Sequence, residues 1–237
     1  MNVSCPSSRA WTLGLVVGLV CGSAAQAGRP LQTDDAGVLD RGACEMEAFA
    51  ARVSIAATRK RQVQMGCGLG LSTQLALATG SQRAEGERTQ TVSLAGKTEL
   101  LQGPAAAAGP SHVLTFAYTV DWARGFGQSW RHATSDLKLI YSGPLASEFT
   151  LHANIGSGRD EQARRGHASW ALAVEHGGWR NVALMTEVFG DDREPPWWNV
   201  GLRWAVLPDR WFADLSYGRL VSGSRPRLLT IGSKLVF

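Results

Sequence analysis

The sequence predicts an all-β protein: a single up-and-down antiparallel transmembrane β-barrel of the type found in outer membranes. Three observations predict this fold. Apolar residues alternate with small or charged residues at a period of two over most of the chain. A segment with the features of an export signal precedes the alternating part, and the chain ends on an aromatic residue, Phe237. We expect about twelve strands, with ten as the alternative.

Residues 1–27 have the features of a cleaved signal peptide. Arg9 supplies the positive charge, an apolar run extends from Trp11 to Val20, and Ala25-Gln26-Ala27 has the spacing of a cleavage site. This apolar run is too short to span a membrane as a helix. After the leader we expect an irregular periplasmic segment, residues 28–43, and then the barrel, residues 44–237.

The composition excludes several other classes of protein. The chain has 237 residues, of which 44% are hydrophobic, and this content is too apolar for a disordered protein. Its formal net charge is only +4 and its longest basic run is Arg59-Lys60-Arg61, so we expect no nucleic-acid partner. No apolar run of about 18 residues follows the leader, which argues against a helical membrane protein.

The alternation predicts the individual strands. In residues 197–206, for example, Val200, Leu202 and Trp204 share one face of a strand, while Asn199 and Arg203 share the other. A soluble sandwich also pairs an apolar face with a polar one, so this pattern alone leaves both architectures open. The predicted strands are 44–54, 57–66, 69–79, 89–101, 111–121, 134–142, 146–155, 167–175, 181–189, 197–206, 211–219 and 227–237.

The predicted connections favour the barrel over the sandwich. Short turns on one side and longer loops on the other are typical of outer-membrane barrels, and a soluble sandwich has no reason to maintain this contrast. We expect tight turns at 142–144, 176–178 and 207–210, and longer loops at 80–88, 122–133, 156–166, 190–196 and 220–226.

Two cysteines are expected to form a disulfide. Cys5 and Cys21 lie in the leader, which leaves Cys44 and Cys67, and an even pair in an exported protein indicates a disulfide. If these two residues face each other across an antiparallel hairpin, apolar residues meet apolar ones and polar residues meet polar ones. The hairpin then turns near Ile55-Ala56 and the chain reverses at 66–68. This pairing gives an even strand count and puts both termini on the same side.

The two ends of the mature chain resemble parts of known outer-membrane proteins. A terminal Phe on an alternating strand resembles the signal that such barrels present to the barrel-assembly machinery, which assigns this role to Phe237. Residues 29–40 and 42–47 resemble the start of a bacterial outer-membrane family that is labelled by its phenol-degradation-pathway MetA members and loosely called transporters. The resemblance implies an outer-membrane barrel and brings no catalytic residues.

The polar faces of the predicted strands are expected to line the lumen. They would form a path for a small solute, hydrophobic solutes included, or a network of ion pairs that fills a narrow, structural barrel. We also expect contact with outer-membrane lipid and lipopolysaccharide, through Arg164 and Arg165. The predicted lumen residues are Glu45, Glu47, Lys97, Glu99, Asp136, Lys138, His152, Glu175, Glu187, Arg203, Asp214 and Lys234.

We expect no enzyme activity, cofactor or metal. The pair Asp34-Asp35 offers too few oxygens for calcium, although residues 33–35 could plug the lumen. The spacing of His167 and Ser169 matches that of outer-membrane lipid-A deacylases, with Glu175 or Glu187 as the acidic partner. However, both residues are expected on the lumen face, whereas a lipid-cleaving site should face the membrane.

Overall fold

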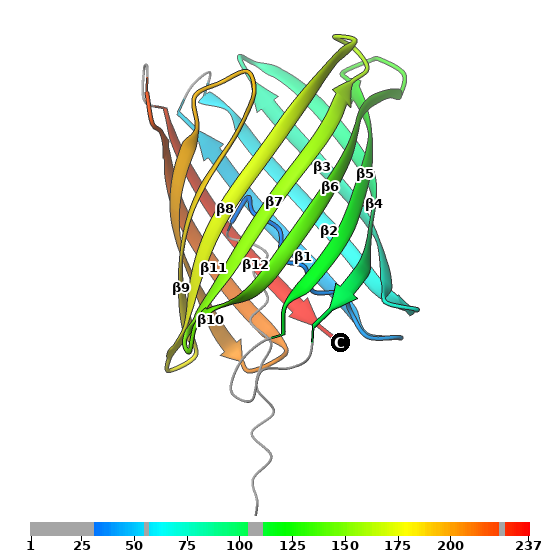
Figure 1. Cartoon of the computed structure of the whole chain (residues 1–237). Coiled ribbons are helices and arrows are strands. Elements are labelled where there is room, and N and C mark those ends of the chain that lie inside the picture. The colour runs from blue at the N-terminus through cyan, green and yellow to red at the C-terminus, as the bar shows by residue number, and fades with distance from the viewer. Residues whose placement is uncertain (1–30, 55–56, 104–110, 223–225) are drawn as a thin grey trace, which may run out of the picture.

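The computed structural model describes residues 31–54, 57–103, 111–222 and 226–237. Over these ranges the chain forms twelve strands, and each strand pairs antiparallel with its neighbours in sequence. Strand β1 also pairs with β12, which closes the sheet into a barrel (Figure 1). The strands are β1 (Cys44–Val53), β2 (Arg59–Gly70), β3 (Thr73–Ala84), β4 (Glu87–Gln102), β5 (Val113–Gly125), β6 (Arg131–Ala146), β7 (Phe149–Asp160), β8 (Arg165–Trp179), β9 (Val182–Asp191), β10 (Trp197–Leu207), β11 (Trp211–Leu220) and β12 (Arg227–Val236).

This architecture confirms the predicted fold class and the count of twelve strands. Closure leaves no strand edge unpaired, because the last strand completes the hydrogen bonding of the first. The predicted leader and the turn near Ile55-Ala56 lie outside the described residues. The described part contains no helix that is both long and apolar enough to cross a membrane.

The wall has its apolar face on the outside. In β10, Val200, Leu202 and Trp204 are exposed, whereas the alternate residues Asn199 and Arg203 are buried in the lumen. The same arrangement is found around the barrel, where large exposed hydrophobic residues alternate with buried polar ones. A wall of this kind suits an apolar solvent outside and a polar interior.

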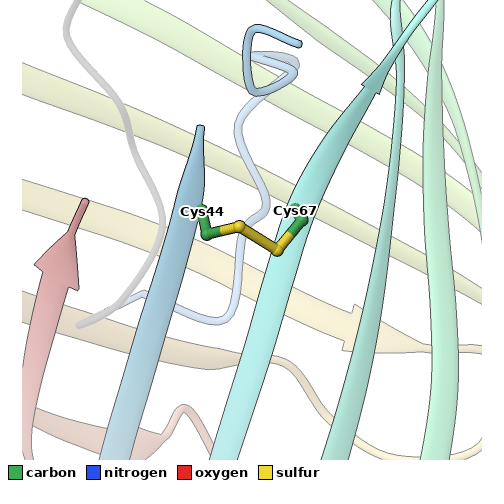
Figure 2. The surroundings of a disulfide bond; sticks show 2 residues. All are labelled: Cys44 and Cys67. Carbon is green, nitrogen blue, oxygen red and sulfur yellow. A yellow bond between two sulfur atoms is a disulfide. The ribbon is translucent and has the colours of Figure 1, made fainter. Parts of the chain in front are cut away.

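The first hairpin has the predicted register. Cys44 lies opposite Cys67, Met46 opposite Met65, and Glu47 opposite Gln64. A disulfide joins Cys44 to Cys67 where β1 begins (Figure 2). The backbone of Cys44 also exchanges two hydrogen bonds with that of Phe237, so the start of β1 and the end of the chain lie together. We call this end of the barrel the terminal end, and the opposite end the distal end.

Several predicted connections are wrong. The predicted tight turns at 142–144 and 176–178 lie within β6 and β8, and the chain reverses at 147–148 and 180–181 instead. Arg180 and Asn181 both have positive φ angles, so this turn forms without the glycines that we took as its signal. The reversal after β2 likewise lies at 71–72 rather than at 66–68.

The expected contrast between short and long connections holds in part, since the chain turns tightly at 147–148, 180–181 and 208–210 at the terminal end and has longer connections at 126–130 and 192–196 at the distal end. Other connections depart from it. Most of the predicted loop 156–166 is strand, because β7 extends to Asp160 and β8 begins at Arg165. The predicted loop 80–88 is a two-residue turn, and the ten-residue connection between β4 and β5 lies at the terminal end. Strand pairing continues through these polar, glycine-containing stretches, since each backbone group finds its partner on the neighbouring strand.

Candidate functional site

The chain before β1 enters the lumen. We expected residues 28–43 to be an irregular periplasmic segment. Its described part has no strand, and residues 31–40 lie inside the barrel, against inward side chains of β3 to β7 and β9. We call residues 31–40 the N-terminal plug. An irregular segment can be buried here because the polar lumen supplies partners for its backbone.

Glu187 on β9 anchors the start of the plug. Its carboxylate accepts hydrogen bonds from the backbone N–H groups of Gln32 and Thr33, at 2.8–2.9 Å, and from the Thr33 hydroxyl at 2.6 Å. The Asn199 amide on β10 donates a further bond at 2.8 Å. Glu187 is only 2% exposed, so the plug supplies most of the donors that satisfy this buried charge.

Two lysines hold the middle of the plug. Lys138 Nζ on β6 lies 2.6 Å from the Asp34 carboxylate. Lys97 Nζ on β4 donates to the carbonyl oxygen of Asp35 at 2.8 Å, and its distance to the Asp35 carboxylate is 3.9 Å. Asn154 on β7 donates to the carbonyl of Asp34. Asp34 and Asp35, which we considered as cation ligands, are therefore turned toward lysines.

Ala36 is fully buried in the lumen. Its N–H donates to the Ser142 hydroxyl at 2.8 Å, and its carbonyl accepts from the Thr115 hydroxyl at 2.5 Å. Ser142 is in turn 2.8 Å from Nδ1 of His152, which is fully buried. Both polar groups of the Ala36 backbone are thus satisfied by the wall.

Apolar contacts add to these hydrogen bonds. Leu31 packs with Ala173 and Met185, and the methyl group of Ala36 packs with Ala117 and Ile140. These are the two clusters of buried hydrophobic residues found in the described part of the chain, and each includes a residue of the plug. The plug is therefore the element around which the interior packs.

The plug leaves the lumen beside β2. Leu39 donates its N–H to the side-chain oxygen of Gln74, and Arg41 forms a bridge with Gly68. A Cβ atom at position 68 would collide with the carbonyl oxygens of Leu39 and Asp40. Glycine is needed here because the chain passes directly against the backbone of β2.

A polar cavity of about 230 Å³ remains between the plug and the wall. It lies on the side of β1 to β4, β6 and β12 and contains charges of both signs. Within it, Lys234 binds Glu45 at 2.5 Å and lies 3.6 Å from Glu47. The residues that line it are Leu31, Gln32, Asp34, Asp35, Gly37, Leu39, Glu45, Glu47, Gln64, Gln74, Lys97, Lys138 and Lys234.

The remaining predicted lumen residues are distributed along the barrel. Arg203 and Asp214 are buried and directly opposite each other on β10 and β11. Glu175 is buried 3.8 Å from His152. Glu99 shares the inward face of β4 with Lys97 and lies close to the terminal end. Asp136 lies nearer the distal end, away from the plug.

The His167 and Ser169 pair lies on the lumen face, as expected. His167 Nε2 is 3.1 Å from a carboxylate oxygen of Asp136, which is not one of the two acidic partners that we considered. Of those, Glu187 holds the plug and Glu175 lies beside His152. No hydrogen bond joins His167 to Ser169 in the described part of the chain.

The described residues contain no group of three or more His, Cys, Asp or Glu side chains that could hold a metal ion. Sequence reasoning missed the uncharged residues that bind the plug. Their only signal is a polar side chain on an inward position, which by itself does not indicate a contact with a distant segment. These residues are Gln74, Thr115, Ser142, Asn154 and Asn199.

Comparison with known proteins supports the fold. A family model described as "Uncharacterised conserved protein UCP029691" matches residues 15–237, and no curated protein matches the sequence. Among solved structures, "KdgM porin" aligns with a TM-score of 0.59 and 8% identity over 81% of this chain and 99% of that one. "NanC porin structure in rhombohedral crystal form." aligns with a TM-score of 0.59 and 7% identity over 80% and 98%. At such identities the likeness shows the fold alone, a β-barrel that resembles outer-membrane porins.

Proposed function

The chain belongs to the family described as "Uncharacterised conserved protein UCP029691", and we propose that it is an outer-membrane channel whose terminal half is narrowed by its own N-terminal plug. The solutes that it passes are small and polar. The plug is the observation that carries this proposal. It is held mainly by hydrogen bonds and ion pairs to a polar wall, and water can replace such contacts when the plug moves.

The cavity beside the plug supports a small polar solute. Its volume of about 230 Å³ has room for a few water molecules or one small molecule. Its lining includes three lysines together with four carboxylates, so it favours neither sign of charge strongly. A hydrophobic solute, which the sequence also leaves open, does not suit this lining.

The outer face of the barrel wall supports a location in the outer membrane. The exposed apolar band, the closed sheet and the likeness to porins all agree with it. In the usual orientation of such barrels both termini are periplasmic, so the plug narrows the periplasmic half and the distal end faces outward. Phe237 then lies where the barrel-assembly machinery would engage the last strand.

We also propose that the protein is not an enzyme and needs no cofactor. His167 is oriented toward Asp136 inside the lumen rather than toward the membrane. The buried Ser142 and His152 pair is occupied by the plug backbone, since the Ser142 hydroxyl accepts the N–H of Ala36. Unchanged lipid-A mass spectra on overexpression would agree with this assignment, whereas deacylated lipid A would contradict it.

Single-channel recording in planar bilayers tests the proposed channel. We expect small conductance from the wild type and at least tenfold more from a variant that lacks residues 31–39. Deletion of residues 126–129 in a distal loop provides the control and should leave the conductance unchanged. Heat-modifiable migration on a gel establishes that each variant is folded.

The plug also favours a second function, a structural or surface-interaction barrel with a sealed lumen. The two buried hydrophobic clusters both depend on the plug, as expected of a permanent part of the interior. A folded deletion variant that still does not conduct would favour this second function. Envelope integrity and surface binding, measured in a deletion strain, would then be the traits to examine.

A further inference from the structure

Four arginines form a row across the outside of the barrel at its distal end. Arg52 on β1 lies directly opposite Arg59 on β2, Arg59 opposite Arg83 on β3, and Arg83 opposite Arg88 on β4. All four side chains are exposed, and they share the outer face with Ala48 and Ala50 rather than the lumen face with Glu45 and Glu47. We call these four residues the arginine row.

Without an anionic partner, the arginine row destabilises the folded barrel. Like charges directly opposite each other on neighbouring strands repel and destabilise a sheet. In the described part of the chain, none of the four guanidinium groups has a carboxylate within 4.0 Å. By contrast, Arg159 on β7, which is also exposed, pairs with Glu161 at 3.1 Å. A negative group from outside the chain would relieve the repulsion of the row.

A shallow groove of about 640 Å³ lies next to the row. It extends over the outer faces of β12, β1, β2, β3 and β4, where small outward side chains leave a depression in an otherwise bulky wall. Arg88 of the row lines the distal side of the groove together with Arg61. Arg61 is the next outward-facing residue of β2 after Arg59, two positions nearer the terminal end. The small outward residues that line it are Ala48, Ala50, Thr79, Ser81 and Ser233.

We propose that the arginine row and the groove bind a phosphorylated glycolipid of the outer leaflet, namely lipopolysaccharide. The arginines bind the phosphates, and one acyl chain lies in the groove. Guanidinium groups bind phosphate oxygens in a bidentate manner, and several of them together suit a headgroup with more than one phosphate. The choice of leaflet depends on the proposed function, which makes the distal end the outward one.

The charge of the row argues against a second copy of this chain as the occupant. A symmetric pair of barrels that met through this face would bring two arginine rows together, since such interfaces use the same patch twice. The small residues alone would permit close contact between barrels, but the arginines would oppose it. An anionic lipid suits both parts of the surface, because its phosphates bind the arginine row and an acyl chain fills the groove.

Lipid binding by the purified, folded barrel in detergent tests this proposal. The probes are bis-phosphorylated lipid A, the same lipid A without its phosphates, and phosphatidylglycerol. The test variant is Arg59→Gln with Arg83→Gln. The matched control is Arg180→Gln with Arg210→Gln, which removes the same charge from exposed residues at the terminal end.

We expect the wild type and the control to bind bis-phosphorylated lipid A at least tenfold more tightly than the test variant does. Removal of the phosphates should weaken wild-type binding to a similar extent. Without lipid, the melting temperature of the test variant should equal or exceed that of the wild type, because the repulsion is reduced. Lipid A should raise the melting temperature of the wild type but not that of the variant. Should the test variant fail to fold, Arg61→Gln with Arg88→Gln takes its place.

Three results would overturn the proposal. Equal affinity of wild type and test variant for bis-phosphorylated lipid A would show that the arginines do not contribute to binding. Equal affinity for phosphatidylglycerol would show a cationic surface that binds any anionic lipid. Self-association that the test variant strengthens or abolishes, without a change in lipid binding, would show an interface between barrels. Channel conductance should be the same in the wild type and the test variant, so a failure here is distinguishable from a failure of the proposed channel.

Discussion

The two halves of the lumen have the same kind of wall and different contents. Near the terminal end, inward side chains such as Thr115, His152 and Glu187 are at most 2% exposed because the plug covers them. Near the distal end, inward residues such as Lys60 and Gln82 are exposed. Alternation is equally regular in both halves.

This difference shows that the strands do not by themselves decide whether the lumen is open. A barrel of about this size lies between those that side chains fill and those that hold a water channel. Here a separate piece of chain narrows one half, and the other half stays accessible. How open the terminal half of the lumen is therefore depends on the contacts of the plug.

Glu187→Ala should have the largest effect on the difference between the plugged terminal half and the accessible distal half of the lumen. Each hydrogen bond to a charged group contributes about 1.5–3 kcal/mol, and Glu187 accepts several from the plug. We expect the plug to leave the lumen and the conductance to approach that of the plug deletion. Asp121→Ala, which removes an inward carboxylate of the distal half, is the matched control and should change little. A folded Glu187→Ala protein with wild-type conductance would show that the anchor is unimportant.

Replacement of Cys44 and Cys67 by serine should come next. The disulfide closes a loop with a sequence separation of 23, for which the chain-entropy estimate is about 3 kcal/mol. We expect a lower urea midpoint for the double variant and faster hydrogen exchange at the terminal end. Thiol titration should find no free thiol in the unfolded, unreduced wild-type mature chain. Two free thiols there would contradict the disulfide.

Gly68→Ala should displace the end of the plug. The added methyl group collides with the carbonyl oxygens of Leu39 and Asp40, and such overpacking costs about 1–3 kcal/mol. We expect a moderate rise in conductance and loss of the Leu39 contact with Gln74. Gly177→Ala is the control, because a Cβ at that position meets no atom within 4 Å. Equal behaviour of the two variants would argue against close passage of the plug over β2.

Lys138→Met should have the smallest effect. The Lys138 and Asp34 side chains are 36% and 39% exposed, so water screens their ion pair despite the 2.6 Å distance. Exposed pairs contribute about 0.2–1 kcal/mol, which limits the change in plug occupancy to about fivefold. Conductance that rises as much as in Glu187→Ala would show instead that this ion pair, rather than the Glu187 anchor, holds the plug.

Much of the wall was predictable because its signals are local. A period of two places apolar residues outside and polar ones inside, and a single cysteine pair sets the register of the first hairpin. The turns were less predictable. Gly143 and Pro144 lie within β6, while the turn at Arg180 and Asn181 contains no glycine, because pairing with neighbouring strands overrides local preference.

The candidate site was predictable only in part. The inward position of Glu187 follows from alternation, and residues 33–35 were considered as a plug. The contact between them joins residues 154 positions apart, and no local pattern encodes it. The arginine row has the same character, since Arg52, Arg59, Arg83 and Arg88 become neighbours only when four strands pair.

The sequence by itself determined the architecture of this protein: an alternating, closed, twelve-stranded wall with a stapled first hairpin. These features follow from side-chain periodicity and from pairing between neighbouring strands, which are short-range in the chain. Only the tertiary structure decided what lies inside and what gathers outside. The irregular plug and the arginine row depend on closure of the barrel, because closure brings distant residues to one place and offers buried backbone its polar partners.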